Sequence, residues 1–183
     1  MTVRDLLQPI PVDARPLVTA RRRGEDCDRE VIEEIAQFLE ACAGTIWFFG
    51  NGGSAATAQH MALDTLNAGR CAASLPNVPI LTALSNDHGY EEALRLYGKT
   101  MIRDGDRSVL LSVSGMSTNL VRLANHCRDS EIISLALVGF GGVGPLAAEA
   151  DLCVAVHSKD YALVEFVHLG LLVAALEVVR SQS

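Results

Sequence analysis

The chain contains one stretch that decides its fold, and it reads Ile-Trp-Phe-Phe-Gly-Asn-Gly-Gly-Ser-Ala-Ala-Thr-Ala-Gln-His-Met-Ala-Leu-Asp-Thr-Leu-Asn, from Ile46 to Asn67. An apolar run rich in β-formers, a glycine cluster and an alanine-rich segment are typical of a buried strand, a tight loop and a helix. Glycines let successive backbone N–H groups converge, and the helix N-terminus adds its positive dipole end. The stretch therefore predicts an anion site, with a plain tight turn as the alternative.

The loop of this stretch supplies the first candidate phosphate ligands, which are Asn51, Gly52, Gly53 and Ser54. The serine either caps the helix or offers its hydroxyl group to a phosphate. Further along the helix, His60 and Asp64 are four residues apart and share a face. They are candidate metal ligands or proton-transfer groups, or else an ordinary surface pair.

Length and composition indicate a single cytosolic domain. With 183 residues the chain is long enough to bury a core, and 49% hydrophobic with only 5% aromatic residues suits helices on a parallel sheet. The net charge of -7 argues against direct nucleic-acid binding. Scattered cysteines, no signal sequence and no run of membrane-spanning length indicate a cytoplasmic protein with no membrane partner.

Alternation of strand and helix signals predicts a doubly wound, mainly parallel five-stranded sheet flanked by helices. The prolines of residues 1–24 indicate an N-terminal arm or short irregular helix, which leaves residues 25–183 as one domain. The predicted strands are the run that begins at Ile46, then 80–84, 108–113, 131–138 and 152–156. The predicted helices besides the one after Gly53 are 28–43, 91–101, 118–128, 145–150 and 161–179.

Two more polar clusters follow predicted strands. Ser112, Ser114 and Ser117 lie between a strand and a helix N-terminus, where hydroxyl and backbone donors suit a dianion, with helix capping alone as the alternative. Asp87 lies in the segment 85–89, at the expected C-terminal end of a strand, where open α/β sheets place ligand contacts. A plain turn is the alternative for that segment.

The final predicted helix is apolar on almost every side. Such a helix is buried, and at a chain end it usually packs on another subunit. Glu165 is costly there unless it is paired or binds a metal.

Together these residues resemble the sugar isomerase (SIS) fold and, within it, the phosphoheptose isomerase branch, over roughly residues 28–179. The motifs that carry the resemblance are Gly50-Asn51-Gly52-Gly53-Ser54-Ala55 with Ala58-Gln59-His60, Ser85-Asn86-Asp87-x-Gly89, and Ser112-x-Ser114-Gly115-x-Ser117. The resemblance implies a phosphosugar pocket and a homotetramer with sites between subunits. It also implies conversion of sedoheptulose 7-phosphate to a heptose 7-phosphate.

The resemblance also implies a metal site. Family members that bind zinc use positions that correspond here to His60, Asp64, Glu165 and Val173, and only His60 is unchanged. The first three remain a possible ligand set for zinc or another divalent cation. Arg70 resembles a family arginine near the phosphate pocket, with one inserted residue before it.

The departures from the family bear on catalysis. Isomerisation through an enediolate needs a base and an acid near carbons 1 and 2. Asp64 retains a carboxylate but is one methylene shorter than the family glutamate, which can cost on the order of a hundredfold in rate. Val173 cannot transfer a proton, and His168 lies roughly 140° away from it around the helix.

The loop around Gly115 also differs, because Val113 and Met116 stand where the family often has threonine and asparagine. The leading hypothesis is a phosphosugar aldose–ketose isomerase, with Asp64 and His60 as catalytic residues. One alternative is a non-catalytic phosphosugar-binding protein, because bacterial relatives that associate with the replication initiator lack the final-helix histidine and act as tetrameric interaction platforms. Another is a different reaction on the same ligand class.

Overall fold

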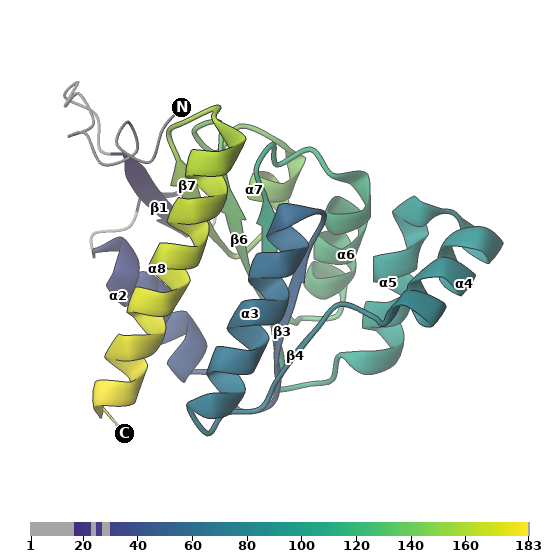
Figure 1. The fold of residues 1–183 in the computed structure, drawn as a ribbon, viewed down its shortest axis with the longest axis horizontal. Helices are drawn as coiled ribbons and strands as arrows, with labels where there is room; N and C mark the ends of the chain where they lie inside the picture. Colours follow the sequence, from purple (N-terminus) through teal and green to yellow (C-terminus); the bar gives the residue numbers. More distant parts are fainter. Residues whose placement is uncertain (1–16, 23–24, 27–29, 183) are drawn as a thin grey trace.

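The computed structural model describes residues 17–22, 25–26 and 30–182, which form a three-layer α/β/α arrangement (Figure 1). The strands are β1 (Val18–Arg22), β2 (Glu25–Asp26), β3 (Ile46–Gly50), β4 (Ala72–Ser74), β5 (Arg107–Ser112), β6 (Ile133–Val138) and β7 (Leu152–Val156). The helices are α2 (Val31–Glu40), α3 (Gly53–Asn67), α4 (Val78–His88), α5 (Tyr90–Met101), α6 (Thr118–Asp129), α7 (Pro145–Glu149) and α8 (Tyr161–Gln182).

The sheet has the order β2-β1-β7-β6-β5-β3-β4, and five of its strands, from β7 to β4, run parallel. Side chains alternate between its two faces, as period-2 strands require. Ile46 and Phe48 pack with α2, α3 and α8 on one face. Trp47 and Phe49 pack with α5, α6 and α7 on the other. The doubly wound, mainly parallel sheet is therefore confirmed.

The strand predicted at 80–84 is wrong, because this run belongs to α4. Asn77 caps that helix by accepting a hydrogen bond from the Ile80 N–H at 3.1 Å, and Pro79 lies in the first helical turn. Both features mark a helix start. The fifth parallel strand is instead β4, which pairs with β3 over three residues.

The described part of the predicted N-terminal arm contains β1. This strand pairs antiparallel with β7, from Val18 opposite Val156 to Arg22 opposite Leu152. Arg22 also reaches Glu34 on α2, with 2.6 Å between Nη2 and Oε2. Residues 18–22 thus extend the sheet, while most of the arm lies outside the described residues, and the boundary at residue 24 stays a prediction.

Helix α8 confirms the predicted final helix, and its expected packing against another subunit stays a prediction. By length and composition alone it is long and apolar enough to cross a membrane. It packs against α2 and α3, and one side of it is buried: Val164, His168, Leu172, Ala175, Leu176 and Val179. The core helix of a soluble domain has the same properties, and the opposite side of α8 remains open in the single chain.

His168 is the polar exception on the buried side of α8. Only 1% of its surface is exposed, and within the described residues neither ring nitrogen has a hydrogen-bond partner. Burial lowers the pKa of His168 to about 4, with the nearby Val138 backbone opposing part of the shift. The imidazole is therefore neutral in the fold, and it lies on the buried side of α8, so it does not replace the histidine that the family has at the position of Val173.

We expect His168→Leu to flatten the acid side of the stability profile. The folded-state pKa lies below the unfolded value, so the unfolded chain binds the extra proton first and wild-type stability falls as pH drops from about 6.5 to about 4. The full loss is roughly 3 kcal/mol at about 1.4 kcal/mol per pKa unit. Urea unfolding midpoints at pH 7.5, 6 and 5 follow the decline, of which about 2 kcal/mol is expected by pH 5. His88→Leu removes an exposed histidine as a control, and an equal flattening there would contradict the assignment.

Candidate active site

The candidate site lies where the chain changes direction across the sheet. From β3 the chain passes to β4 on one side and then returns to β5 on the other side of β3. Open α/β sheets bind ligands outside the carboxyl ends of strands at such a switch point. The loop after β3, which contains Asn51 and Gly52, is called the glycine loop, and residues 112–117 after β5 are called the serine loop. Both loops lie at this end of the sheet, as the sequence predicts.

The β3–α3 loop depends on two glycines. A Cβ atom at Gly50 would lie 2.6 Å from the backbone of Ser54, so the first turn of α3 sits directly against the strand end. Gly52 has φ +55° and forms the N-cap without a side-chain hydrogen bond. Capping by Ser54 is therefore wrong, and its buried hydroxyl stays a predicted phosphate contact.

In the described part of the chain, the first amides of α3 have no backbone acceptor, although the Glu165 carboxylate lies close to Gly53. Within the described residues, the first α3 amide with a backbone acceptor belongs to Ala55, which donates to Asn51 and Gly52 carbonyls. The amides of Gly53 and Ser54 precede it and, with the helix dipole, suit an anion. Neither this loop nor the serine loop contains a lysine or arginine, so anion binding would depend on N–H and hydroxyl groups.

The serine loop folds back on itself. The Ser112 hydroxyl accepts from the Gly115 N–H and lies 3.2 Å from the Ser117 hydroxyl. The Ser114 hydroxyl accepts from the Met116 N–H. No side chain caps α6, whose N-cap is Ser117. The hydroxyl groups therefore shape a curved loop next to the first turn of α6, and each hydroxyl oxygen can accept further hydrogen bonds.

A pair of asparagines joins the two loops. Asn51 Nδ2 donates to Asn119 Oδ1 at 3.0 Å, and Asn119 Nδ2 donates back to Asn51 Oδ1 at 2.9 Å. Asn119 is buried in the first turn of α6. Asn51 was a predicted phosphate ligand, whereas Asn119 carried no local signal in the sequence. Neither did Tyr90, at the start of α5, whose hydroxyl donates to Asn51 Oδ1 at 2.7 Å.

The predicted acid–base pair lies on the outer side of α3. His60 Nε2 is 3.2 Å from Asp64 Oδ2, and the side chains are 52% and 29% exposed. His60 follows Gly53 by seven residues, which is roughly 10 Å along the helix axis. The pair is thus formed as expected, but away from the two loops.

Glu165 does not join this pair within one chain. A Cβ atom at Gly53 would lie 2.4 Å from a Glu165 carboxylate oxygen, so this carboxylate sits at the N-terminal end of α3. Across the described ranges, no three His, Cys, Asp or Glu side chains are grouped to hold a metal. A zinc or other divalent-cation site made from His60, Asp64 and Glu165 stays a prediction that would require a second subunit.

Two other predicted ligands occupy different surroundings. Arg70 donates to the carbonyls of Leu39, Glu40 and Cys42 at 3.0–3.1 Å, so it caps the C-terminus of α2 at the amino ends of the strands. That placement does not support phosphate binding by Arg70 in its own chain. Asp87 lies in the last turn of α4, and not after a strand as expected. It is exposed, three residues before Tyr90.

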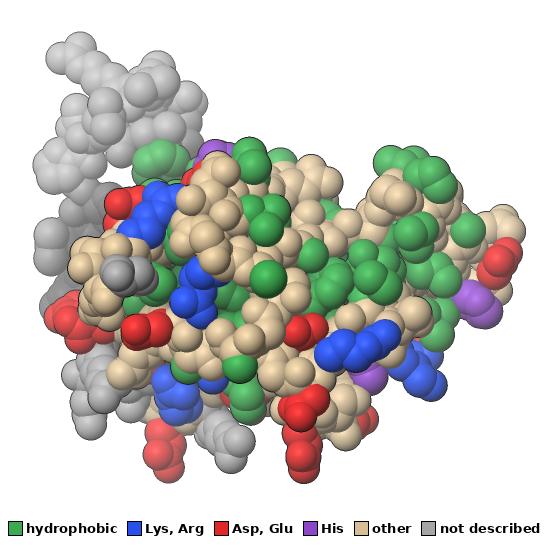
Figure 2. All heavy atoms as spheres, turned by 90° about the horizontal axis from the view of Figure 1, so that it is seen from below, with side chains coloured by type: hydrophobic (Ala, Val, Ile, Leu, Met, Phe, Trp, Pro, Cys, Tyr) green, Lys and Arg blue, Asp and Glu red, His purple; other side chains and the backbone are tan. Residues whose placement is uncertain are grey.

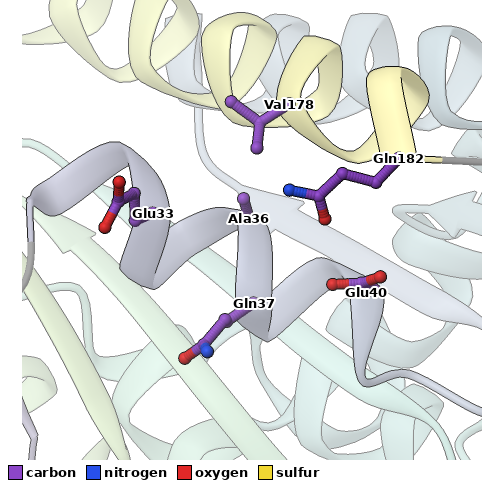
Figure 3. A pocket seen from close by; sticks show the side chains of 6 residues that line it. All are labelled: Glu33, Ala36, Gln37, Glu40, Val178 and Gln182. Carbon is purple, nitrogen blue, oxygen red and sulfur yellow. The ribbon is translucent and has the colours of Figure 1, made fainter.

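A separate pocket of about 370 Å³ lies between α2 and the end of α8 (Figure 3). It is lined by Glu33, Ala36, Gln37, Glu40, Val178 and Gln182. Helix α8 runs back from the carboxyl end of β7, so this pocket is at the opposite end of the sheet from the two loops. The carboxylates of Glu33 and Glu40 in its lining repel a phosphate, so this pocket is not the site that the two loops form.

Several known proteins are similar to this chain in sequence and in fold. Residues 21–139 match the SIS domain family. A phosphoheptose isomerase of Roseiflexus sp. is 31% identical over 172 residues, covering 85% of this chain and 87% of that protein. Another, of Rhodospirillum rubrum, is 35% identical over 158 residues, covering 80% and 82%. The structure of phosphoheptose isomerase GmhA from Neisseria gonorrhoeae matches with a TM-score of 0.77 at 29% identity, covering 82% of this chain and 85% of that chain.

Proposed function

The chain belongs to the SIS domain family, in its phosphoheptose isomerase branch, and we propose that it isomerises sedoheptulose 7-phosphate or a close relative between ketose and aldose forms. The observation that carries this proposal is the hydrogen-bonded pair of Asn51 and Asn119, which joins the two loops with predicted phosphate contacts at the switch point of the sheet. Helix N-termini and serine hydroxyls are well suited to a phosphate dianion.

The proposed chemistry assigns proton transfer to Asp64 and His60. Isomerisation moves a proton between carbons 1 and 2 through an enediolate, so it needs a base at carbon and an acid at oxygen. Asp64 is the base, and His60, in contact with its carboxylate, exchanges the proton at oxygen. The distance of this pair from the loops suits a substrate that carries its phosphate and its reacting carbons at opposite ends.

We also propose a homotetramer with sites between subunits, because large apolar side chains are exposed on the single chain. Leu63 and Leu66 lie exposed on α3, and Phe166 on α8 is 72% exposed. Helix α4 has no buried residue, and hydrophobic side chains gather over the protruding α4–α5 part (Figure 2). Such surfaces are typical of subunit contacts. A neighbouring chain would bring further groups to His60 and Asp64, and with them any metal.

We expect proton NMR with sedoheptulose 7-phosphate in D2O to show an aldose product carrying deuterium on the carbon next to its carbonyl. The enediolate intermediate exchanges that proton with solvent, which is the reason for deuterium entry. Parallel samples with zinc and with a chelator divide the mechanism. Loss of turnover with chelator, restored by zinc, supports the ligand set His60, Asp64 and Glu165, whereas unchanged turnover supports a metal-free pair.

Absence of both product and deuterium would contradict the isomerase proposal. If the sugar phosphate still binds in that case, the protein is a phosphosugar-binding or interaction protein. One residue favours this second candidate function, because Val173 supplies neither a ligand nor a proton where zinc-binding relatives have a histidine. A stable partner retained by the pure tetramer would then identify an interaction platform such as one for the replication initiator.

A further inference from the structure

The turn between β6 and α7, residues 139–144, packs against the serine loop at two points. The Gly139 N–H donates to the Val113 carbonyl at 2.9 Å, and the Leu146 N–H, at the start of α7, donates to the Gly115 carbonyl at 3.2 Å. Both carbonyls belong to buried residues, so both need such a partner. The serine loop is therefore held from outside at two of its carbonyl groups.

The backbone of this turn approaches the serine loop more closely than a side chain would allow. A Cβ atom at Gly139 would lie 2.6 Å from the Val113 carbonyl oxygen, and one at Gly144 would lie 2.9 Å from the Gly115 carbonyl oxygen. Gly144 also has φ +146° and ψ 163°, a conformation that essentially only glycine adopts. Both the close contact and the backbone geometry therefore require glycine at position 144.

Gly115 is the residue through which this contact reaches the hydroxyl groups of the loop. Its N–H donates to the Ser112 hydroxyl, which in turn lies 3.2 Å from the Ser117 hydroxyl. Its carbonyl is bound from the other side by the Leu146 N–H. A displacement of Gly115 thus changes the positions of the Ser112 and Ser117 hydroxyls, which are two of the predicted phosphate contacts.

Gly144 is held firmly on its C-terminal side. The next residue, Pro145, has a fixed φ, and Leu146 is fully buried in the core that α5 and α6 cover. A methyl group added at Gly144 is therefore expected to displace the Gly115 carbonyl and, with it, the serine loop.

We propose that Gly144 is a positioning residue for phosphate binding, because it sets through Gly115 where the hydroxyl groups of the serine loop lie. This role rests on the proposed function, since it concerns the phosphate end of the same phosphosugar. Charge-assisted hydrogen bonds are strong, so misplaced hydroxyl donors lower the affinity for a phosphate dianion. The predicted acid–base pair lies on α3, away from the serine loop, so the effect falls on binding and not on the chemical step.

The test compares Gly144→Ala with Gly142→Ala. Gly142 lies in the same turn with φ +74°, and a Cβ atom there would lie 2.9 Å from the Cβ atom of Ala155 on β7. The two variants share the added methyl group, an unfavourable φ and an equally close contact, but only Gly144→Ala presses on the serine loop. Titration calorimetry with inorganic phosphate and with sedoheptulose 7-phosphate measures affinity, steady-state kinetics separates KM from kcat, and Tm reports on the fold.

Gly144→Ala is expected to raise the Kd for inorganic phosphate and the KM for the sugar phosphate by about tenfold, the effect of losing one hydrogen bond to a charged group. We expect kcat to stay at the wild-type value. Both variants should lower Tm, because an L-residue is strained at either position. Gly142→Ala should leave the Kd and the KM unchanged.

Wild-type affinity for both ligands in a folded Gly144→Ala protein would overturn the positioning role alone. An equal loss of phosphate binding in Gly142→Ala would also overturn it, because the cause would then be a general loosening of the turn. If Gly144→Ala does not fold, Gly115→Ala acts on the same peptide more mildly, since its Cβ atom would lie 3.5 Å from the Val143 carbonyl oxygen. Unchanged phosphate binding there would contradict the role. Wild-type protein that neither binds nor converts the sugar phosphate would overturn the proposed function as well.

Discussion

Replacing Asp64 by asparagine is expected to lower kcat for heptose phosphate isomerisation by at least about a hundredfold. Asparagine has nearly the same shape, and its amide oxygen can still accept a hydrogen bond from His60, so the pair on α3 should survive. What disappears is the ability to take a proton from carbon. Because the side chain is part-exposed, the fold should not depend on its charge. The measurement is kcat of the wild type and of Asp64→Asn, and the Tm of both proteins checks that the fold is intact.

The variant Asp64→Glu keeps the negative charge and changes only the position of the carboxylate. Asp64→Glu restores the methylene that the family glutamate has, and we expect it to retain or raise kcat. Asp129→Asn removes an exposed carboxylate at the end of α6, far from α3, and should leave kcat unchanged. Turnover by Asp64→Asn at the wild-type rate would remove Asp64 from the mechanism and leave the base to another group.

Removing the Asp106 carboxylate is expected to cost about 3 to 5 kcal/mol of unfolding free energy. This carboxylate accepts the Thr45 N–H at 2.7 Å and the Arg103 N–H at 2.9 Å. It also accepts the Trp47 indole N–H at 2.8 Å. In Asp106→Ala all three donors lose their partner at the entry of β3 and β5, the two strands that carry the loops. A fall in Tm of about 10 °C follows from the scaling for a chain of this size.

Asp104→Ala supplies the matched control. Asp104 is exposed two residues before Asp106, so its loss should change Tm by no more than about 1 °C. Protein concentration must be equal in all samples, because assembly makes Tm depend on it. A wild-type Tm for Asp106→Ala would mean that solvent or a rearranged loop satisfies the three donors. Since the carboxylate positions β3 relative to β5, we expect activity to fall together with stability.

The sheet was largely predictable because its central strands are short apolar runs bounded by turn residues. The misplaced strand at 80–84 shows the limit of that signal, since a short apolar run fits a helix or a strand equally. The Asn77 and Pro79 pair before it was the decisive local clue. Strand β4 had no comparable signal: its Ala-Ala-Ser sequence has little strand preference, and it exists because it pairs with β3.

The two loops of the candidate site were predictable for the same local reason, because glycine and serine follow strands and precede helices. What joins the loops was not. Asn51 and Asn119 are 68 residues apart, and no spacing rule connects them. Arg70 likewise depended on tertiary structure, since a free arginine and one that caps α2 look identical in sequence. The position of Glu165 at Gly53 also required the packing of α8 against α3.

The two borders of the sheet limit how copies of this protein can polymerise. Within the described residues, one border strand is β2, with two residues and an exposed Glu25, and the other is β4, with three residues. Short border strands, one of them charged, offer little backbone of their own for a foreign strand, and this discourages fibril growth and strand exchange, while within the described residues β2 leaves the outer edge of residues 18–20 in β1 uncovered. Copies that meet at high concentration should therefore associate through helix faces, and light scattering should detect small closed particles instead of open-ended fibres.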